Sequence, residues 1–511
     1  MAVAAGSLVF VFYPGKGDMS TGRRSKNMAD EFKNFIDGQW VNASDGSFFA
    51  QRNPANLDEV TGMWPAATRA DAVRAIQAAG KAYPGWRSLS PYKRAEYLKK
   101  VLKSMIERRA ALAEIITREN GKTLKESLAE VDSAIREMEY QIFEGIRLFG
   151  ETAPAAHDGV FACSMRVPLG VVSIISPWNF PLNVPGRKLT PALMAGNTCV
   201  FKPSSLTPQT GMRFVELFVE AGLPAGVLNF ITGGGSTVGE ELVTNAAIKA
   251  ITFTGSTEVG QKINQKASVI MARTQLEMGG KNPIIVLEDA DLQDAAKSAV
   301  AAAFACAGQW CTSTSRMIVD KKIAGQLTQL LLLETQKIVV GPGSDPEATM
   351  GPVCGAEQLK SVISYIEIGK EQGAKLVFGG ACKEGKAFER GCFIQPTIFA
   401  DVTPDMTIAK EEIFGPVLSI MEVDGFAEAV ALANSVKFGL ASSIYTADLH
   451  KAFTFLEKTD AGLTHVNMMT AYKEPQLSFG GVKASGFGIP EAGSTGLEFF
   501  TEHKVAYIKY R

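Results

Sequence analysis

Four short apolar runs constrain the fold of this chain more than any other feature. They are Gly170–Ser176, Thr198–Phe201, Val227–Ile231 and Ala250–Phe253, and each has glycine or proline on at least one side. Helical segments lie between them, and such alternation is typical of a parallel sheet with helices on both faces. Ligands of such sheets bind at the carboxyl ends of the strands, so we expect the functional site there.

Other segments extend this α/β pattern. Residues 35–41 predict a short hairpin with an Asp-Gly turn. Residues 70–149 are predicted to be helical, because apolar residues recur at i, i+3, i+4 and i+7 from Leu98. A second αβ series runs from about residue 284 to 467.

The composition gives no support for nucleic-acid binding, membrane insertion, a disulfide framework or metal binding. The chain has 511 residues, 46% hydrophobic and 21% charged, with a formal net charge of −1. That balance does not favour nucleic acid or an anionic membrane as a partner. No apolar run reaches the roughly 18 residues of a membrane span. Seven scattered cysteines without a Cys-x-x-Cys pair indicate a reducing compartment, and four distant histidines predict no metal site.

The start of the chain differs in character from the rest. Residues 2–13 are apolar but no basic region precedes them, so they make a poor signal peptide. Met28 opens a second, ordinary-looking start. We expect residues 1–27 to be an over-extended start or a disordered tail rather than a targeting segment, and the protein to be cytoplasmic.

Cys311 and Glu277 stand out among the reactive side chains, because both lie beside glycines, where the backbone can be approached closely. A cysteine thiolate is a strong nucleophile that can form a thioester, and a carboxylate can activate the water that hydrolyses it. Taken singly, such a cysteine is more often a small buried hydrophobic residue, and such a glutamate a solvated surface charge.

Seven motifs stand in an order that resembles one family. They are Pro177–Pro181, Lys202–Ser204, Phe253–Gly260, Leu276–Lys281, Gly308–Cys311, Glu411–Pro416 and Phe479–Lys483. In these motifs the chain resembles the aldehyde dehydrogenase superfamily, the NAD(P)-dependent and non-acylating kind. The resemblance covers about Phe35 to the C-terminus.

The resemblance implies an α/β fold with a Rossmann-type cofactor domain, an α/β catalytic domain and a β oligomerisation arm. The expected cofactor domain comprises residues 28–150 and 169–283, and the catalytic domain residues 284–485. Residues 151–168 and 497–511 would form the arm, which extends a neighbouring subunit's sheet in a homodimer or homotetramer. The alternative is that the arm packs on its own subunit.

The resemblance also implies roles in catalysis. Cys311 attacks the aldehyde, and the side-chain amide of Asn179, with the backbone N–H of Cys311, stabilises the oxyanion. A hydride passes to the nicotinamide, and Glu277 activates water to hydrolyse the thioester. Without the resemblance, Asn179 could simply shape a turn. We interpret Cys306 as structural, because nothing nearby in the sequence suggests a positive environment.

A further set of residues is implied to bind the cofactor. The loop Gly255–Gly260 opens a helix after a strand, and a helix N-terminus suits the pyrophosphate. Glu412 would hold the nicotinamide ribose, with Phe414 nearby, and Lys202 the adenosine ribose. The expected cofactor residues are Trp178, Lys202, Ser204, Ser205, Gly255, Ser256, Met278, Glu412 and Phe414.

Ser205 bears on the choice of cofactor. Many NAD-preferring relatives carry glutamate at this position, where a carboxylate would repel a 2′-phosphate. Serine does not repel it, although serine is compatible with both cofactors. We therefore expect NADP or NAD to be used, with NADP favoured.

Arg187 bears on the substrate. Broad-specificity members often carry Trp at this position, whereas a guanidinium in the substrate tunnel would bind a distal carboxylate. Succinate-semialdehyde enzymes add a second Arg where this chain has Ala305, and residues 308–316 look more like enzymes of 2-oxoglutarate semialdehyde (2,5-dioxopentanoate). Succinate semialdehyde and broad specificity remain alternatives, as does a purely structural ion pair of Arg187.

Two other functions are compatible with the same fold. A CoA-acylating enzyme passes the acyl group to a thiol and usually lacks the base glutamate, so the presence of Glu277 counts against it. A structural protein could share the fold without activity, but Cys311, Glu277 and Asn179 are all in place.

Overall fold

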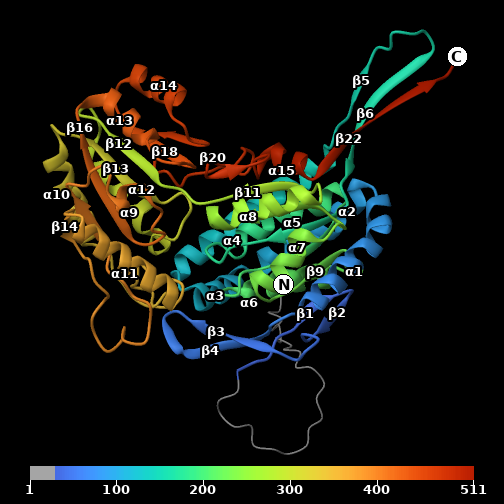
Figure 1. Cartoon of the computed structure of the whole chain (residues 1–511), viewed down its shortest axis with the longest axis horizontal. Coiled ribbons are helices and arrows are strands. Elements are labelled where there is room, and N and C mark those ends of the chain that lie inside the picture. Colours follow the sequence, from blue (N-terminus) through green and yellow to red (C-terminus); the bar gives the residue numbers. More distant parts are fainter. Residues whose placement is uncertain (1–28) are drawn as a thin grey trace, which may run out of the picture.

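The computed structural model describes residues 29–511, so the expectation for residues 1–27 lies outside the described part of the chain. Two sheets with their helices form the body of the molecule, and a narrow three-stranded arm projects from it (Figure 1). The predicted α/β fold is confirmed.

The first sheet has eight strands in the order β2-β1-β9-β8-β7-β10-β11-β21. The five strands from β9 to β11 are parallel; β1 and β21 pair antiparallel with the two outer strands of this set, and β2 pairs antiparallel with β1. The predicted hairpin is β1 and β2, and the four apolar runs are β7 to β10. The bounds are β1 Asn34–Ile36, β2 Gln39–Val41, β7 Val171–Ile175, β8 Thr198–Lys202, β9 Leu228–Phe230, β10 Ile248–Thr254, β11 Arg273–Glu277 and β21 Gly486–Phe487.

Helices cover both faces of this sheet, and alternate residues of one strand face different cores. In β8, Cys199 and Phe201 belong to the core under α2 to α6, whereas Val200 packs in the core under α1, α7 and α8. The predicted burial of both faces is therefore confirmed. The bounds are α1 Arg69–Ser88, α2 Pro91–Glu107, α3 Arg109–Asn120, α4 Leu124–Ile146, α5 Asn183–Ala195, α6 Pro208–Glu220, α7 Glu240–Thr244 and α8 Thr257–Val269.

Side-chain caps at helix N-termini explain where the predicted helical region begins and where one of its later helices starts. Thr68 and Asp71 form a capping box at the start of α1, and Thr123 and Glu126 form another at the start of α4. The helical spacing around Leu98 corresponds to α2.

The second αβ series forms a seven-stranded sheet in the order β14-β15-β16-β13-β12-β18-β19. All neighbours are parallel except β14 with β15. The strands are β12 Asn282–Val286, β13 Thr314–Asp320, β14 Lys375–Phe378, β15 Thr397–Ala400, β16 Val417–Val423, β18 Ala441–Tyr445 and β19 Leu463–Val466. The helices are α9 Leu292–Phe304, α10 Ala324–Thr335, α11 Ala356–Glu371, α12 Thr407–Lys410, α13 Gly425–Asn434 and α14 Leu449–Lys458.

Small elements join these units. The hairpin β3 (Phe48–Asn53) with β4 (Asn56–Pro65) lies below the first sheet in Figure 1, and β17 (Phe438–Gly439) pairs with β20 (Val482–Lys483). Helix α15 (Gly493–Phe499) leads into the C-terminal strand.

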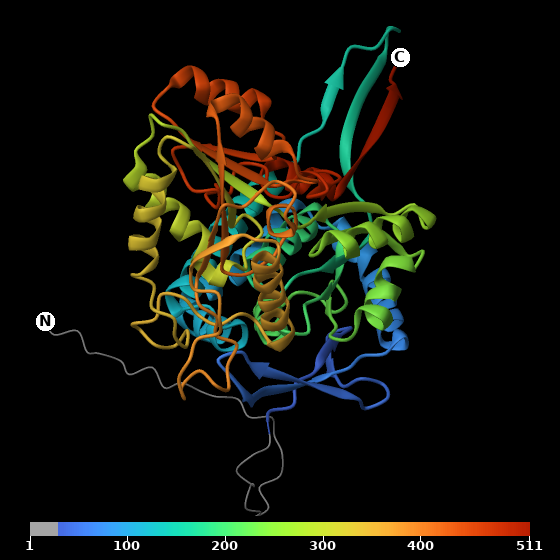
Figure 2. The same ribbon diagram turned by 60° about the vertical axis from the view of Figure 1, so that its left-hand side comes forward.

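The arm consists of β5 (Glu151–Ala153), β6 (Val160–Pro168) and β22 (Thr501–Lys509). β22 pairs with β6 along its whole length, so the β-prone tail finds its strand partner within the same chain. Figure 2 shows the arm standing clear of the body. Its role in assembly and the domain boundaries remain predictions.

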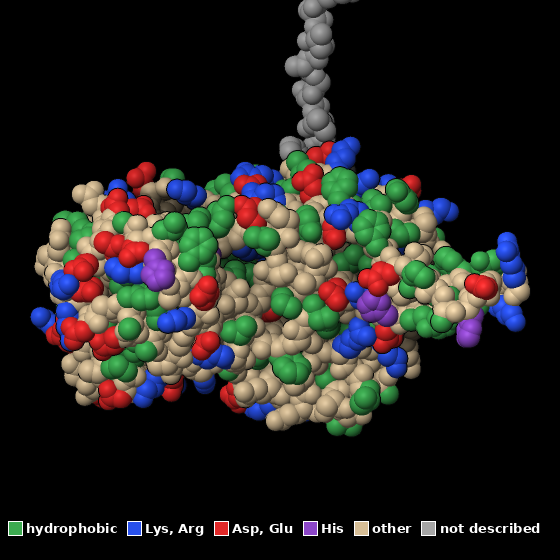
Figure 3. Space-filling view, turned by 90° about the horizontal axis from the view of Figure 1, so that it is seen from above, with side chains coloured by type: hydrophobic (Ala, Val, Ile, Leu, Met, Phe, Trp, Pro, Cys, Tyr) green, Lys and Arg blue, Asp and Glu red, His purple; other side chains and the backbone are tan. Residues whose placement is uncertain are grey.

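The surface mixes charges of both signs. Figure 3 shows Lys and Arg interspersed with Asp and Glu over the face seen from above. Within residues 29–511, no helix combines the length and apolarity that crossing a membrane requires.

Candidate active site

Four neighbouring strands bring the sequence motifs to one edge of the first sheet. β8, β7, β10 and β11 lie side by side and end at Lys202, Ile175, Thr254 and Glu277. Asn179 follows β7, Gly255 follows β10, and Glu277 is itself the last residue of β11. Because parallel strands share one carboxyl edge, residues about 100 positions apart in the sequence lie around one site.

Cys311 lies on a contorted loop between α9 and β13. Cys306 (φ 52°), Ala307 (φ 54°) and Gly308 (φ 69°) adopt left-handed backbone after α9 ends. A Cβ on Gly308 would lie 2.1 Å from the carbonyl oxygen of Gly415, so this position requires glycine. The turn places Cys311 beside the carboxyl edge of the first sheet, where it lines cavities with Thr254 and Met278.

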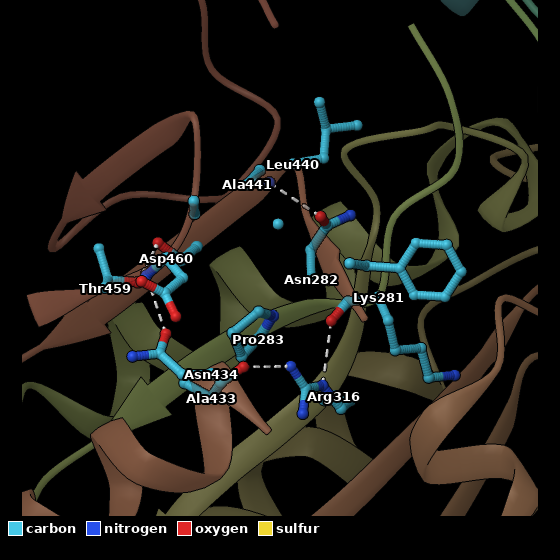
Figure 4. Close-up of a pocket in the computed structure, with 14 residues that line it drawn as sticks. Lys281, Asn282, Pro283, Arg316, Ala433, Asn434, Leu440, Ala441, Thr459 and Asp460 are labelled. Atoms are coloured by element: carbon cyan, nitrogen blue, oxygen red, sulfur yellow. Dashed lines mark hydrogen bonds between the residues drawn. The ribbon is translucent and has the colours of Figure 1, made fainter. Parts of the chain in front are cut away.

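Asn282 fixes this loop from behind. Its amide Nδ2 donates to the carbonyl oxygens of Cys311 and Ser313, each at 2.8 Å. Its Oδ1 accepts the N–H of Ala441 at 3.0 Å, and Figure 4 shows this bond beside Arg316, which donates to Lys281 and Ala433. Asn282 is buried and follows the Leu276–Lys281 motif directly, but a single asparagine gave no signal in the sequence.

Two cavities meet at Cys311. The larger, about 330 Å³, contains Arg187, Glu277 and Phe479, and the smaller, about 220 Å³, contains Ser256, Glu412 and Phe414. Both are lined by Asn179, Thr254, Met278 and Cys311. A thiol at the junction can face two different ligands, one from each side.

The resting thiol of Cys311 is held in its neutral form. Its pKa is raised to about 12, chiefly by burial; the charges of Arg187 and Lys473 lower it, and the carboxylates of Glu412 and Glu277 raise it. Cys306 is fully buried, which also raises its pKa, and its backbone N–H donates to Glu126 at 2.6 Å. The two thiols differ in position: only Cys311 lines both cavities.

Glu277 is a buried carboxyl beside the thiol. Burial, and then the charge of Glu491, raise its pKa well above the ordinary value, while Lys188 and Arg187 partly offset them. Its Oε2 accepts the N–H of Gly481 at 3.1 Å. A carboxylate whose pKa is raised takes up a proton more readily than an ordinary one, which suits a general base.

Asn179 is held from both ends. Its side-chain Nδ2 donates to the carbonyl of Gln309 at 3.1 Å, two residues before Cys311. Its own carbonyl accepts from the buried Lys122 Nζ at 2.6 Å, and Lys122 is paired with Glu130 at 2.8 Å. An amide carries two N–H donors, so one remains for an oxygen at the junction. Lys122 was not recognised in the sequence, because it lies in a helical connection far from the motifs.

The smaller cavity has features suited to a dinucleotide. Ser256 caps α8 by accepting the N–H of Val259 at 3.4 Å, and other first-turn N–H groups of α8 remain for an anion. Glu412 Oε1 accepts the N–H of Gly280 at 2.8 Å, and a Cβ on Gly279 would lie 2.1 Å from Glu412 Oε2. Burial raises the pKa of Glu412 to about 7.

Of the remaining expected cofactor residues, Trp178 and Phe414 line this cavity, whereas Lys202, Ser204 and Ser205 do not. Trp178 and Phe414 meet edge-on with ring centroids 5.4 Å apart. Lys202 is buried, which lowers its pKa to about 8, and its Nζ donates to the carbonyl of Pro203 at 3.2 Å. Ser204 accepts the N–H of Leu206, and Ser205 is exposed.

Arg187 lines the larger cavity and also forms an ion pair. Its Nε lies 3.1 Å from Glu491 Oε2, and its Nη1 lies 4.0 Å from Glu137 Oε1. Burial opposes its charge, but Glu491 and Glu137 hold its pKa above the ordinary value. Neither Nε nor Nη1 makes a well-directed hydrogen bond within residues 29–511. Arg187 thus lines the cavity and is ion-paired there, and its binding of a substrate carboxylate stays a prediction.

Two cavities that meet at one thiol can hold two ligands, one on each side of the reactive group. A family model for the aldehyde dehydrogenase family matches residues 40–506, and the chain belongs to this family.

Similar proteins have related activities. The chain is 43% identical over 478 residues to the alpha-ketoglutaric semialdehyde dehydrogenase of Bacillus subtilis, covering 94% of this chain and 98% of the relative. It is 41% identical over 472 residues to the 2,5-dioxopentanoate dehydrogenase of Saccharolobus solfataricus, covering 92% and 98%. Betaine aldehyde dehydrogenase from Staphylococcus aureus, solved with NAD+, superposes with a TM-score of 0.91 at 33% identity, covering 94% and 96%.

Proposed function

We propose that this chain oxidises 2-oxoglutarate semialdehyde (2,5-dioxopentanoate) to the carboxylic acid with NAD(P)+ through a thioester on Cys311. The observation that carries the proposal is a cavity that holds the thiol and the guanidinium of Arg187 together. The named activities of the two relatives support the choice of substrate.

The residues around the smaller cavity fit a nicotinamide dinucleotide. Gly279 and Gly280 let Glu412 lie against the backbone with a carboxylate oxygen still available for ribose hydroxyls, and α8 presents its N-terminus. Trp178, Ser204, Met278 and Phe414 would enclose the ligand, and Lys202 and Ser205 would lie at the adenosine ribose. When bound, NAD(P)+ supplies the acceptor for the hydride.

In the first half-reaction, the Cys311 sulfur bonds to the aldehyde carbon. The aldehyde oxygen gains negative charge, which the free N–H of Asn179 and the backbone N–H of Cys311 stabilise. The thiol must first lose its proton, and the charges of Arg187 and Lys473 favour the thiolate. Loss of the hydride leaves a thioester.

In the second half-reaction, Glu277 takes a proton from water as the water attacks the thioester carbonyl. The Cys311 sulfur leaves, and the acid is released. Water as acceptor distinguishes this scheme from acyl transfer to CoA, in which no such base is required.

Ser205 and Ala305 bear on the preferred cofactor and on the substrate. Ser205 places no carboxylate near the adenosine ribose, which supports NADP as the favoured cofactor. Ala305 lines the larger cavity without charge, which supports a substrate other than succinate semialdehyde, the second candidate.

The arm supports a proposal for assembly. Tyr507 (75% exposed) and Ile508 (53% exposed) leave apolar surface on β22 uncovered, so we propose a homodimer or homotetramer in which a second copy covers it. For location we propose the cytoplasm.

A comparison of aldehydes tests this function. We expect kcat/KM for 2,5-dioxopentanoate to exceed that for pentanal by about 100-fold or more, since hydrogen-bonded charges contribute about 1.5–3 kcal/mol each. Arg187→Met should remove most of this difference. Equal kcat/KM for both aldehydes in the unmodified enzyme would contradict the proposal.

A further inference from the structure

A second cation lies beside Arg187 in the larger cavity. Lys473 belongs to the loop after β19, and its side chain is 21% exposed. Its Nζ lies 2.5 Å from Glu137 Oε1 and 3.2 Å from Asn183 Oδ1. The motif search in the sequence did not single out this residue, because no spacing relates it to Arg187.

Arg187 and Lys473 share their surroundings. The Arg187 guanidinium carbon is 4.3 Å, and Lys473 Nζ 6.0 Å, from the centroid of the Phe479 ring. Glu137 Oε1 lies between the two cations, 4.0 Å from Arg187 and 2.5 Å from Lys473. The two positive groups therefore converge on one wall of the cavity.

The charges on this wall do not balance. Among the described residues the cluster contains three cations, Arg187, Lys188 and Lys473, and two carboxylates, Glu137 and Glu491. Glu277 makes no ion pair with these cations among the described residues. A buried surplus cation is unfavourable unless an anion pairs with it. One incoming carboxylate would balance the cluster.

Donor groups are also left over. An ammonium has three N–H donors, and Lys473 uses two of them, on Glu137 and Asn183. Nη1 of Arg187 makes no hydrogen bond in the described part of the chain, whereas its Nε is engaged in the ion pair with Glu491 at 3.1 Å. The third donor of Lys473 and Nη1 of Arg187 are therefore left over, which suits a carboxylate, because a carboxylate accepts several hydrogen bonds at once.

We propose that Lys473 is a specificity-determining residue that binds the distal carboxylate of the substrate together with Arg187. This inference rests on the proposed function. Ala305, on the wall of the same cavity, supplies no charge, so Lys473 provides the second cation from a different loop.

The test measures the ratio of kcat/KM for 2,5-dioxopentanoate to that for pentanal. Lys473→Met should lower this ratio about 10- to 100-fold, mainly through KM, since one hydrogen bond to a charged group is lost. Lys473→Arg should restore most of the ratio. Arg136→Met is the matched control, because Arg136 is an exposed cation that also lines this cavity; it should change the ratio less than about threefold, since exposed charges are screened.

The outcomes separate the two proposals. A ratio near one in the unmodified enzyme overturns the proposed function. A large ratio that Arg187→Met abolishes but Lys473→Met preserves overturns the role of Lys473 alone. An equal effect of Arg136→Met and Lys473→Met also overturns it, since general charge attraction would then suffice. If Lys473→Met does not fold, Lys473→Gln, which keeps a donor for Glu137, serves in its place with the same expected loss.

Discussion

The two cavities that meet at Cys311 are built in different ways. The smaller cavity, on the proposed cofactor side, is formed largely by loops that directly follow β7, β10 and β11, and the second αβ series contributes Glu412. The larger cavity, on the proposed substrate side, is formed by side chains from α4, α5 and the loops around Cys306 and Lys473. In the proposed function, backbone groups and glycines bind a cofactor common to many enzymes, whereas converging side chains set the choice of aldehyde.

The junction of the two cavities should show the largest effect. Cys311→Ala removes the nucleophile and should lower kcat/KM by about 10⁴-fold or more, because the covalent path is lost. The assay is NAD(P)H formation at saturating cofactor. Cys306→Ala, five residues away, should stay within about threefold of the unmodified enzyme. Comparable losses of kcat/KM in both variants would contradict the assignment of Cys311 as the nucleophile.

Asn179 also lines both cavities, so its effect should fall on chemistry more than on either ligand. Asn179→Ala should lower kcat by about 10²- to 10³-fold, the usual cost of one oxyanion donor, with KM for both substrates little changed. Thermal unfolding serves as the control, because Nδ2 also holds the carbonyl of Gln309. A loss confined to KM would contradict the role of Asn179.

Ser205→Glu should act on the cofactor side alone. A carboxylate near the 2′-phosphate should lower kcat/KM with NADP about tenfold, since charges about 4 Å apart near the surface interact by 1 kcal/mol or more. Ser205→Gln, of similar size but neutral, is the control. The preference among aldehydes should not change. A matching change in aldehyde preference would mean that the two cavities are not independent.

The smallest effect concerns pH. The pKa of Lys202 is lowered to about 8 by burial, so its ammonium is present below pH 8 and lost as pH rises through that value. The ratio of NADP affinity to NAD affinity should therefore fall a few-fold between pH 7 and pH 9. Isothermal titration with each cofactor measures it. Lys202→Met should abolish this pH dependence, and a ratio independent of pH in the unmodified enzyme would contradict it.

The same contrast explains what the sequence could predict. Gly255 could be placed because it closely follows the apolar run Ala250–Phe253, so local pattern and parallel pairing suffice. Glu277 ends β11, which is not an apolar run, and was identified by its motif. Cys311 could be placed because its loop carries glycine where the backbone turns. These features are local, and the fold brings them together by one rule, the shared carboxyl edge of the sheet.

The sequence did not point to the other residues of the site, and the reason is again physical. Lys473, Glu137 and Glu491 come from segments more than 300 positions apart at the extremes, and no spacing links them. Asn282 and Lys122 act on carbonyl groups of the backbone, which any sequence provides. Arg187 was identified as a cation near the substrate, but its ion pair with Glu491 required the folded chain.

The central claim is that the acyl group is carried by Cys311 and released by Glu277. The Glu277→Gln variant, mixed with 2,5-dioxopentanoate and NAD(P)+, tests it by rapid quenching and mass spectrometry of the peptides. We expect at most one equivalent of NAD(P)H per active site and an acyl mass on the peptide that carries Cys311. An acyl mass on Cys306 or another residue, or sustained turnover with no acylated peptide, would contradict the account.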